Sequence, residues 1–597
     1  MLSQTFSSRY LKSSIALNGP LVRLGSFSDI LDYTSKAKSI TIKIEMTFTQ
    51  DQLWITGIRE VFLEYTFGGK DDQNKGYDGD FHPGIVRGVV KVKNADGEIE
   101  TISFDQMDAA KGGPEHLFTV ADFDSRSKGA LSKEYPDYKI EGCSKVDIVP
   151  SNLTVNYDHT KKLSLTLVPY LIGSQAYLKN MPNDESEELK KINIPIAFLD
   201  RLRVMIDQEY IDRVNNFVIP DEILSMMEGE TAKKFNINRV RDLLAREAVV
   251  LTAEIIPESS KLEEGGIDIA TWRAIVESLD EKVKKSFFDF LVRNREAIQG
   301  VWYSNTKRNR RRANFTLPAF QELDHYLSFI FERNLKYLGP LRNEPQAMYQ
   351  AFDLSESTRV GLKGEYTAAV LHINKSAKIR YPVIKELADG HIAVAYKFDT
   401  LAAACTEWLT YLGVVTSVQT SDRGKLGYEL MVKTTVDDQW QDLTHVGVGV
   451  SQILPIVVMA LLSTEDDVLI FEQPELHLHP KVQSRLADFF MAISSSTKQC
   501  IIETHSEYVI NRLRLRIAQS RDDSIRDKSS ILFVEKNEGR TGFKSIDITP
   551  YGAILEWPKD FFDQTDNEVE SILLEASRKK REEKLANALD QINNGWL

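Results

Sequence analysis

The feature that most constrains the fold is a pair of short apolar runs, each ending in a carboxylate. The first is Val468–Phe471, followed by Glu472, and the second is Gln499–Glu503, about thirty residues later. A short apolar run is typical of a strand that is buried in a parallel sheet. A carboxylate at the carboxyl end of such a strand lies where ligands bind in open α/β sheets. The two runs therefore predict neighbouring parallel strands that share a polar edge.

Glu472 is suited to hold a magnesium ion at this edge. Mg²⁺ takes oxygen ligands and is typically held by one or two carboxylates together with phosphate oxygens. For the first run alone, a surface glutamate at a strand end is the simpler interpretation. His505 follows the second run almost directly. A lone histidine at such a place is more often structural. Next to a strand that ends in a metal-binding acid, however, it can donate a hydrogen bond to a phosphate as charge develops. Together the two residues favour a phosphate site.

A glycine-rich segment, Val446–Pro455 (VGVGVSQILP), precedes the first run by about twenty residues. It leads into an apolar stretch, Ile453–Leu462, that predicts a buried helix. Two glycines ahead of a helix, with Ser451 at its cap, form an anion-binding end, because free N–H groups and the positive end of the helix dipole meet there. This segment predicts a second contact for phosphate.

The remaining sequence divides by its hydrophobic pattern, and the fold class that we predict is α/β. Ser39–Thr47 and Lys162–Val168 alternate apolar and polar residues, as half-buried strands do, whereas Phe198–Val214 and Trp272–Val292 repeat apolar residues at helical spacing. We predict a β-rich part at 1–195, a helical insertion at 196–336, a C-terminal lobe of alternating α and β at 337–556 and a charged helical tail at 557–597.

Composition excludes several classes of protein. With 42% hydrophobic and 27% charged residues in 597 positions, the chain can bury two or three cores and is not disordered. Its net charge of -13 rules out a polycation. Cys143, Cys405 and Cys500 form no CxxC pair, which fits a reducing compartment. No apolar run is long enough to span a membrane, so we expect a cytoplasmic protein without a membrane partner.

One dense basic run, KRNRRR, lies inside the predicted helical insertion. A solvated loop or helix face is one interpretation, and contact with DNA or an acidic partner is the other, because phosphate neutralisation needs clustered cations. Its cations are Lys307, Arg308, Arg310, Arg311 and Arg312.

In their order and spacing, the three segments resemble ABC-type ATPases of the SMC, RecF and OLD branch. Gly447, Gly449, Ser451 and Gln452 match the signature motif, Glu472 the Walker B acid and His505 the switch histidine. A bacterial group of OLD-like AAA ATPases, frequent in phage-defence loci and carrying a domain of unknown function, is similar over almost the whole chain. The segments similar to that group are EQPELHLHP at 472–480, LNGPLVRLGSF at 17–27, YLGPLRNEP at 337–345 and WPKDFFD at 557–563.

The resemblance implies ATP and Mg²⁺ as cofactors and an ABC-type ATPase head as the fold. It also implies a homodimer or higher even oligomer, in which Ser451 contacts the nucleotide of the partner. Glu475, His477 and His479 would lie in the D-loop that touches the partner protomer. The dimer would control an effector, such as a nuclease, in antiphage defence.

The sequence departs from the ATPase pattern in two places. Gln473 stands where the catalytic glutamate usually follows the Walker B acid. An amide cannot act as a general base but can orient water, so we expect slow hydrolysis; the alternative is that Gln473 only packs. The second departure is that no Walker A loop, G-x-x-x-x-G-K-[ST], occurs in the 597 residues.

Two explanations of the missing Walker A loop remain open. Met1–Thr5 resembles the end of the helix that follows such a loop, so we expect the chain to start downstream of the true start. The alternative is a natural half-site that contributes only its trans face. In either case we expect weak ATP binding by this chain alone, because the loop supplies most contacts to the β- and γ-phosphates.

Two other functions compete with an ATPase. An OLD-type nuclease needs a Toprim domain, but only about ninety residues follow His505 and no D-x-D follows a strand there. A scaffold that binds no nucleotide, and instead binds DNA or a partner through the basic run, is the stronger alternative because of the missing loop.

Overall fold

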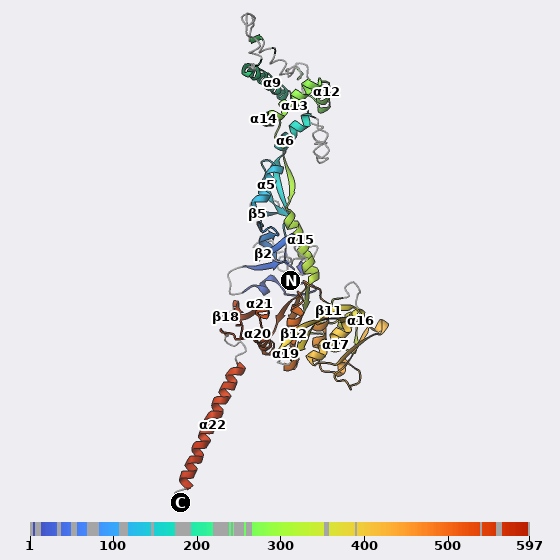
Figure 1. The fold of residues 1–597 in the computed structure, drawn as a ribbon, viewed down its shortest axis with the longest axis vertical. Helices are drawn as coiled ribbons and strands as arrows, with labels where there is room; N and C mark the ends of the chain where they lie inside the picture. The colour runs from blue at the N-terminus through green and yellow to red at the C-terminus, as the bar shows by residue number, and fades with distance from the viewer. Residues whose placement is uncertain are drawn as a thin grey trace. The chain divides into compact units, whose positions relative to one another are not determined.

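The chain is described here by a computed structural model (Figure 1). It divides into two compact units: one joins Met1–Thr41, Phe67–Gly84 and His325–Leu597, and the other joins Ile42–Thr66 and Ile85–Asp324. The described residues are 4–5, 14–32, 38–48, 57–68, 83–106, 117–144, 148–172, 193–218, 222, 238–239, 243, 256–257, 266–350, 358–387, 391–537, 540–556 and 564–594. The segment WPKDFFD at 557–563 lies outside them.

An eight-stranded sheet contains most of the strands of the N-terminal half, in chain order from β1 to β8. Strands β3 to β8 are antiparallel to their neighbours. The predicted strand Ser39–Thr47 is β1, so that prediction is confirmed. The strands are β1 (Ser39–Thr47), β2 (Ile58–Gly68), β3 (Gly84–Asn94), β4 (Ile99–Gln106), β5 (Leu117–Phe123), β6 (Lys139–Ser144), β7 (Asn152–Asp158) and β8 (Arg310–Thr316).

Helices are inserted between the later strands of this sheet or follow the last of them, and those from α6 to α14 share a core built around Trp272, Phe287, Phe290 and Trp302. They are α5 (Ser125–Glu134), α6 (His159–Ile172), α9 (Ile196–Asn216), α12 (Ile269–Glu277), α13 (Glu281–Arg293), α14 (Arg295–Asn305) and α15 (Pro318–Phe329). The predicted helix at Phe198–Val214 is confirmed, since it lies within α9. The predicted helical segment Trp272–Val292 forms two helices, α12 and α13, and Asp280 caps the start of the second.

The predicted strand Lys162–Val168 is wrong, because this segment belongs to helix α6. The buried positions there include Thr160, Ser164, Leu167 and Leu171, which recur every three or four residues. That spacing places them on one face of a helix. The alternation of leucine with polar residues in KLSLTLV therefore misled the prediction, since the same residues also satisfy a helical period.

The other unit is built on a three-stranded parallel sheet in the order β17–β16–β9. These strands are β9 (Leu335–Leu338), β16 (Val468–Glu472) and β17 (Gln499–Glu503). The predicted pair of neighbouring parallel strands is thus confirmed. Burial is less complete than predicted, because Leu469 and Phe471 are buried whereas the alternate residues of β16 are half-buried.

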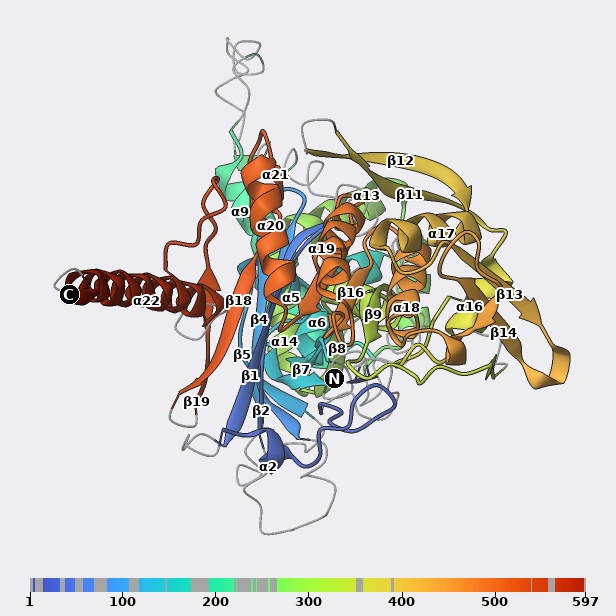
Figure 2. The ribbon, with the colours of Figure 1, turned by 90° about the horizontal axis from the view of Figure 1, so that it is seen from below.

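Helices α17 (Leu401–Leu412), α18 (Gly449–Leu462) and α19 (Pro480–Ser494) lie beside β9 and β16 in Figure 2. The predicted buried helix is confirmed as α18, in which every residue from Val450 to Leu461 is buried. Aromatic rings join sheet and helices: Phe471 lies 5.1 Å from Phe490, and Trp408 lies 4.8 Å from Phe489 between ring centroids. This core fixes the position of β16 and its terminal carboxylate.

A buried ion cluster ties α19 to α20 (Glu507–Gln519), the helix that follows β17. Asp488 of α19 is fully buried and accepts hydrogen bonds from Arg512 at 2.6 Å, Arg516 at 2.8 Å and the Tyr411 hydroxyl at 2.8 Å. Burial alone would raise the pKa of Asp488, but these donors hold it below its usual value. The cluster holds together the two helices that begin next to the carboxyl edge of the sheet.

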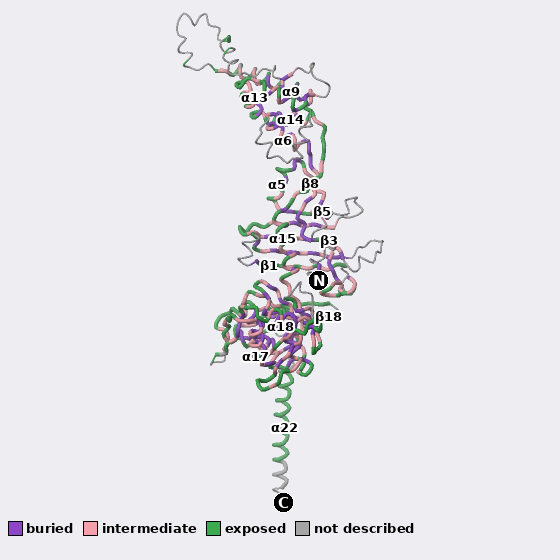
Figure 3. Tube along the Cα trace, turned by 90° about the vertical axis from the view of Figure 1, so that its right-hand side faces the viewer, coloured by how far each residue is buried: buried purple, intermediate pink, exposed green. Residues whose placement is uncertain are grey.

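The remaining elements of this unit form antiparallel pairs and short helices, and α22 confirms the predicted C-terminal helix. Figure 3 shows α22 exposed along its described length. Across the described parts of the chain, no helix is long and apolar enough to cross a membrane. These elements are α2 (Phe27–Ile30), β10 (Met348–Tyr349), α16 (Thr367–Asn374), β11 (Lys378–Glu386), β12 (Ile392–Thr400), β13 (Ser417–Asp422), β14 (Tyr428–Lys433), β15 (Gln441–Asp442), α21 (Ser524–Asp527), β18 (Ile531–Asn537), β19 (Arg540–Ile546) and α22 (Gln564–Asn594).

Candidate functional site

The carboxyl ends of the three parallel strands form one polar edge. In the register of the sheet, Glu472 at the end of β16 is opposite Glu503 at the end of β17, and Phe471 is opposite Leu338 at the end of β9. His505 follows β17 by two residues. The structure therefore brings Glu472 and His505 to the same edge, as the sequence predicts.

Glu472 receives two contacts, one from β9 and one from the segment that follows it. The Tyr337 hydroxyl donates a hydrogen bond to Oε2 of Glu472 at 3.0 Å, and Nη2 of Arg342 donates to the Glu472 carbonyl oxygen at 3.2 Å. Burial, and next the hydrogen bond to Glu472, raise the pKa of Tyr337 to about 12. Tyr337 is therefore a neutral donor at neutral pH, and it restricts the orientation of the Glu472 carboxylate.

Gln473 begins a tight turn directly after β16. Its φ of 43° is in the left-handed region, which a residue with a side chain adopts at a cost of about 1–3 kcal/mol unless its surroundings enforce it. Its backbone N–H donates to the Glu503 carbonyl oxygen at 2.9 Å and to Glu503 Oε2 at 3.1 Å. The turn is thereby tied to β17, and Gln473 is held beside the edge.

His505 is held through its backbone and exposed through its side chain. Its N–H donates to Oε1 of Glu475 at 2.6 Å, while its imidazole is 76% exposed and Nε2 lies 3.2 Å from Glu503 Oε1. A backbone fixed by a carboxylate and a ring open to solvent suit a side chain that meets a bound ligand. The same hydrogen bond draws Glu475 inward, where it is only 8% exposed.

The predicted D-loop residues therefore differ in their surroundings. Glu475 faces the interior, so its side chain is not available for the partner contact that we expected of it. His477 and His479 are exposed. His477 has a φ of 59°, and Nδ1 of His479 accepts a hydrogen bond from the Lys481 N–H at 3.2 Å as the cap of α19. Only the two histidines remain candidates for contact with a partner.

The signature segment forms the start of α18, although its serine is not the cap. The cap residue is Val448, and Ser451 lies in the first turn, 7% exposed, with its hydroxyl donating to the Val448 carbonyl oxygen at 2.7 Å. The predicted capping role is therefore wrong. Gln452 is also buried, at 9% exposure, whereas Gly447 is exposed. A Cβ at Gly449 would lie 3.4 Å from Cδ2 of Leu478, so this segment packs against the loop that follows β16.

Arg342 is a site residue that sequence reasoning missed. It is 7% exposed, and burial lowers its pKa to about 10, although Tyr337, Glu472 and Glu475 counteract that lowering. A signal was present, since YLGPLRNEP begins on a strand of the parallel sheet and continues past its carboxyl end. Tyr337 belongs to the same motif, and its place on β9 brings its hydroxyl to the edge.

The basic run is part loop and part strand: residues 307–309 are exposed and form neither helix nor strand, as the solvated-loop interpretation expects, whereas Arg310–Arg312 form the start of β8. Arg310 donates to Oδ1 and the carbonyl oxygen of Asn156, and Arg312 forms an ion pair with Glu141 at 2.7 Å. The Arg308 guanidinium lies 5.2 Å from the centre of the Tyr303 ring. These internal partners weaken the interpretation of the run as a free patch for DNA.

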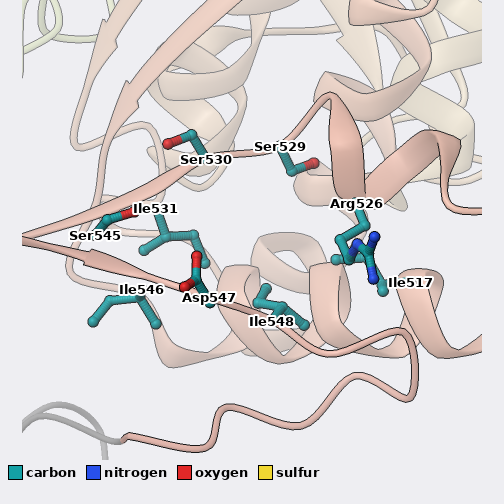
Figure 4. Close-up of a pocket in the computed structure, with 9 residues that line it drawn as sticks. All are labelled: Ile517, Arg526, Ser529, Ser530, Ile531, Ser545, Ile546, Asp547 and Ile548. Carbon is teal, nitrogen blue, oxygen red and sulfur yellow. The ribbon is translucent and has the colours of Figure 1, made fainter.

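A separate pocket of about 340 Å³ lies between α20, α21 and the β18–β19 hairpin (Figure 4). Arg526 of α21 and Asp547, which follows β19, line it together with serine hydroxyls. It contains none of the predicted site residues. Its two opposite charges select no single ligand chemistry, so the polar edge of the parallel sheet remains the candidate site.

The donor set at the edge fits a magnesium ion that is completed by a ligand. No group of three or more His, Cys, Asp or Glu side chains in the described ranges is arranged to hold a metal by itself. Glu472 can supply one oxygen ligand, and a phosphate and water would supply the others, as is usual for Mg²⁺.

Two stretches of the chain are similar to known protein families, and the first includes most of this edge. Residues 357–510 match the family described as AAA ATPase domain, and residues 526–572 match a family described as a protein of unknown function (DUF3696). The first match contains Glu472, Gln473 and His505. No curated protein matches the sequence.

Solved structures of SMC ATPases are similar at low identity. One, from work on ATP-driven dimerization and DNA stimulated activation of SMC ATPases, is 14% identical, covers 25% of this chain and 83% of its own, and has a TM-score of 0.19. The SmcHead bound to the C-winged helix domain of ScpA is 13% identical, with 40% and 67% coverage and a TM-score of 0.23. An Smc head domain with an extended coiled coil from Pyrococcus furiosus is 10% identical, with 86% and 80% coverage and a TM-score of 0.20.

Proposed function

We propose that this chain is an ABC-type ATPase in which ATP brings two copies together. The observation that carries the proposal is the polar edge. Glu472 ends the central strand of a parallel sheet, and His505 and Gln473 flank it within the stretch that matches an AAA ATPase domain. A phosphate bound there would meet an acid that can hold Mg²⁺ and an exposed imidazole that can donate a hydrogen bond.

Each residue at the edge would have a distinct role. Glu472, oriented by the Tyr337 hydroxyl, would hold Mg²⁺, which when bound neutralises phosphate charge. Gln473 would orient water without removing its proton, which favours slow turnover. His505 would donate to the terminal phosphate as charge develops.

The signature segment would act on the nucleotide of a second copy. Gly447 is exposed, and no atom lies within 4 Å of a Cβ built on it, so the backbone there is open to a ligand. The start of α18 supplies free N–H groups and the positive end of a helix dipole. Ser451→Arg would then block closure of the dimer without unfolding a single protomer.

ATP binding at this edge also requires a strand that carries a phosphate-binding loop. Within the described residues, β17 is at one edge of the parallel sheet, and Ile501 on it is 47% exposed. An exposed apolar residue on an unpaired strand edge favours pairing with another strand. A further strand, for example from a partner, would complete the sheet next to His505.

The output of the ATPase would be control of an effector. We propose that dimer closure regulates a partner, such as a nuclease, in bacterial antiphage defence. This step depends on the resemblance of EQPELHLHP and its companion segments to defence-associated ATPases.

ATP binding and hydrolysis, measured with the chain and with its longest natural reading frame, test this proposal. Glu472→Gln should lower Mg²⁺-dependent turnover by at least about tenfold, since even loss of a residue that supports a metal ligand costs about 10–100-fold. Glu465→Gln, an exposed glutamate just before the other end of the same strand, is the matched control and should have no effect. Equal turnover in both variants would contradict the role of Glu472.

A scaffold without nucleotide binding is the second candidate function, because the sequence lacks a Walker A loop. If it binds DNA through the basic run, a salt-sensitive mobility shift should disappear when Arg310, Arg311 and Arg312 are changed to alanine. An ATPase rate above background that Glu472→Gln removes would reject this candidate.

A further inference from the structure

Two opposite charges are buried behind the polar edge without their full set of partners. Nε and Nη1 of Arg342, and Oε2 of Glu475, have no hydrogen-bond partner among the described residues. Both side chains are more than nine-tenths buried. An uncompensated buried charge costs several kcal/mol, so each group requires a reason to be there.

Each of these side chains already holds one part of the site. Arg342 donates to the carbonyl oxygen of Glu472, at the end of β16. Glu475 accepts the N–H of His505 at 2.6 Å, a short distance that is typical of a hydrogen bond to a charged acceptor. The two charges thus lie behind the acid on one side and the histidine on the other.

The loop that carries Glu475 is held in a fixed shape. Gln473 and His477 both have left-handed backbone conformations, with φ values of 43° and 59°, on either side of Glu475. The N–H of Leu476 donates to the Gln473 carbonyl oxygen at 3.2 Å. The carboxylate therefore cannot move away from His505 without disturbing a strained turn.

We infer that Glu475 is a positioning residue for His505. The buried carboxylate accepts the backbone N–H of His505, so the placement of the imidazole depends on a carboxylate that touches no ligand. The effect on hydrolysis rests on the proposed function, whereas the contact between Glu475 and the His505 backbone does not.

Hydrogen exchange of the backbone amides at residues 504–508 tests the structural part without any nucleotide. Glu475→Ala removes the acceptor of the His505 N–H, so exchange there should accelerate about tenfold, as expected for the loss of one charge-assisted hydrogen bond. Glu475→Gln keeps an acceptor oxygen and should retain most of the protection. Unchanged exchange in Glu475→Ala would overturn the proposal. Glu465→Ala, remote from the edge, is the control.

Kinetics on the longest reading frame test the catalytic part. Glu475→Ala should lower kcat as His505→Ala does, with little change in KM for ATP. In the His505→Ala background it should cause no further loss, because Glu475 acts on turnover only by positioning the imidazole that His505→Ala removes. Independent, multiplying losses would overturn the positioning role.

The two experiments separate failure of this inference from failure of the proposed function. If no form of the protein hydrolyses ATP, the proposed function fails, while hydrogen exchange still decides whether Glu475 holds His505. Glu475→Gln covers the case in which the alanine variant does not fold.

Discussion

Two buried charge clusters in the same unit differ in how completely they are paired. Asp488 is fully buried, and four of its hydrogen bonds come from Arg512 and Arg516, with another from Tyr411. Arg342 and Glu475 are buried almost as deeply but leave three atoms without partners in the described structure. The first cluster joins helices α19 and α20, and the second lies behind the edge where Glu472 and His505 meet.

This difference indicates that the fully paired cluster stabilises the fold, whereas the incompletely paired cluster belongs to the site. A network whose donors and acceptors are all satisfied is rigid and adds stability only as a whole. A network with unsatisfied groups costs stability, and such groups concentrate where a ligand or a conformational change completes them. We therefore expect changes at Asp488 to act on folding, and changes at Glu475 to act on the site.

The largest expected effect is that of Asp488→Ala. Removing this carboxylate leaves the buried Arg516 and its neighbour Arg512 without a counter-charge, which should cost about 3–5 kcal/mol of unfolding free energy. Denaturant unfolding followed by circular dichroism measures the loss. Glu582→Ala, in an exposed pair with Arg578 on α22, is the control and should leave the transition unchanged. A transition in Asp488→Ala equal to that of the unaltered chain would remove the distinction between the clusters.

The pH dependence of unfolding should reveal the contribution of the same Asp488 cluster to stability. Because the pKa of Asp488 is lowered in the folded state, its contribution is complete above the unfolded value of about 3.9 and is lost as the pH falls through the lower folded value. The unaltered chain should therefore lose stability below about pH 4 more steeply than Asp488→Asn. Parallel profiles for the two proteins would show that Asp488 does not titrate as a paired carboxylate.

A smaller effect is expected at the incompletely paired cluster. Glu475→Ala should cost about 1–3 kcal/mol, the range for loss of one hydrogen bond to a charged group. The double variant with Arg342→Ala should lose less than the sum of the single variants, because each single change leaves the other charge uncompensated. Thermal melts of the four proteins provide this cycle, and strict additivity would mean that the two charges do not interact.

The smallest effect should follow from Tyr337→Phe. The pKa of Tyr337 is raised to about 12, so a neutral hydroxyl is lost and stability should fall by about 0.5–1.5 kcal/mol. The orientation of Glu472 should be affected more than stability, which weaker Mg²⁺-dependence of ATP binding would reveal. Tyr551→Phe, at a tyrosine that is 87% exposed, serves as the control.

The sequence predicts the framework of the site but not its interior. The strands that end in Glu472 and Glu503, and the buried helix before them, follow from local apolar patterns, and the structure contains all three. Burial of Arg342 and Glu475 depends on contacts with segments 130 and 30 residues away, respectively, which no local pattern records. The sequence shows that Glu475 belongs to a loop, but not that its side chain turns inward.

The errors have a similar physical origin. KLSLTLV satisfies both the period of a strand and that of a helix, and long-range packing chose the helix α6. In the run KRNRRR, residues 307–309 are an exposed loop, but Arg310 at the start of β8 pairs with β7, and the local pattern gives no sign of this strand. Ser451 was expected at a cap because the predicted helix started too late, at Ile453 instead of Gly449.

The measurement that tests the central claim most directly is Mg²⁺-dependent ATP turnover by the longest natural reading frame, compared with its Glu472→Gln and His505→Ala variants. The account predicts slow turnover in the unaltered protein, a loss of at least about tenfold in Glu472→Gln and a loss of about 100-fold or more in His505→Ala, with folding intact in all three. Turnover that is the same in all three proteins, or absent from the unaltered one, would contradict the assignment of the polar edge as a nucleotide site.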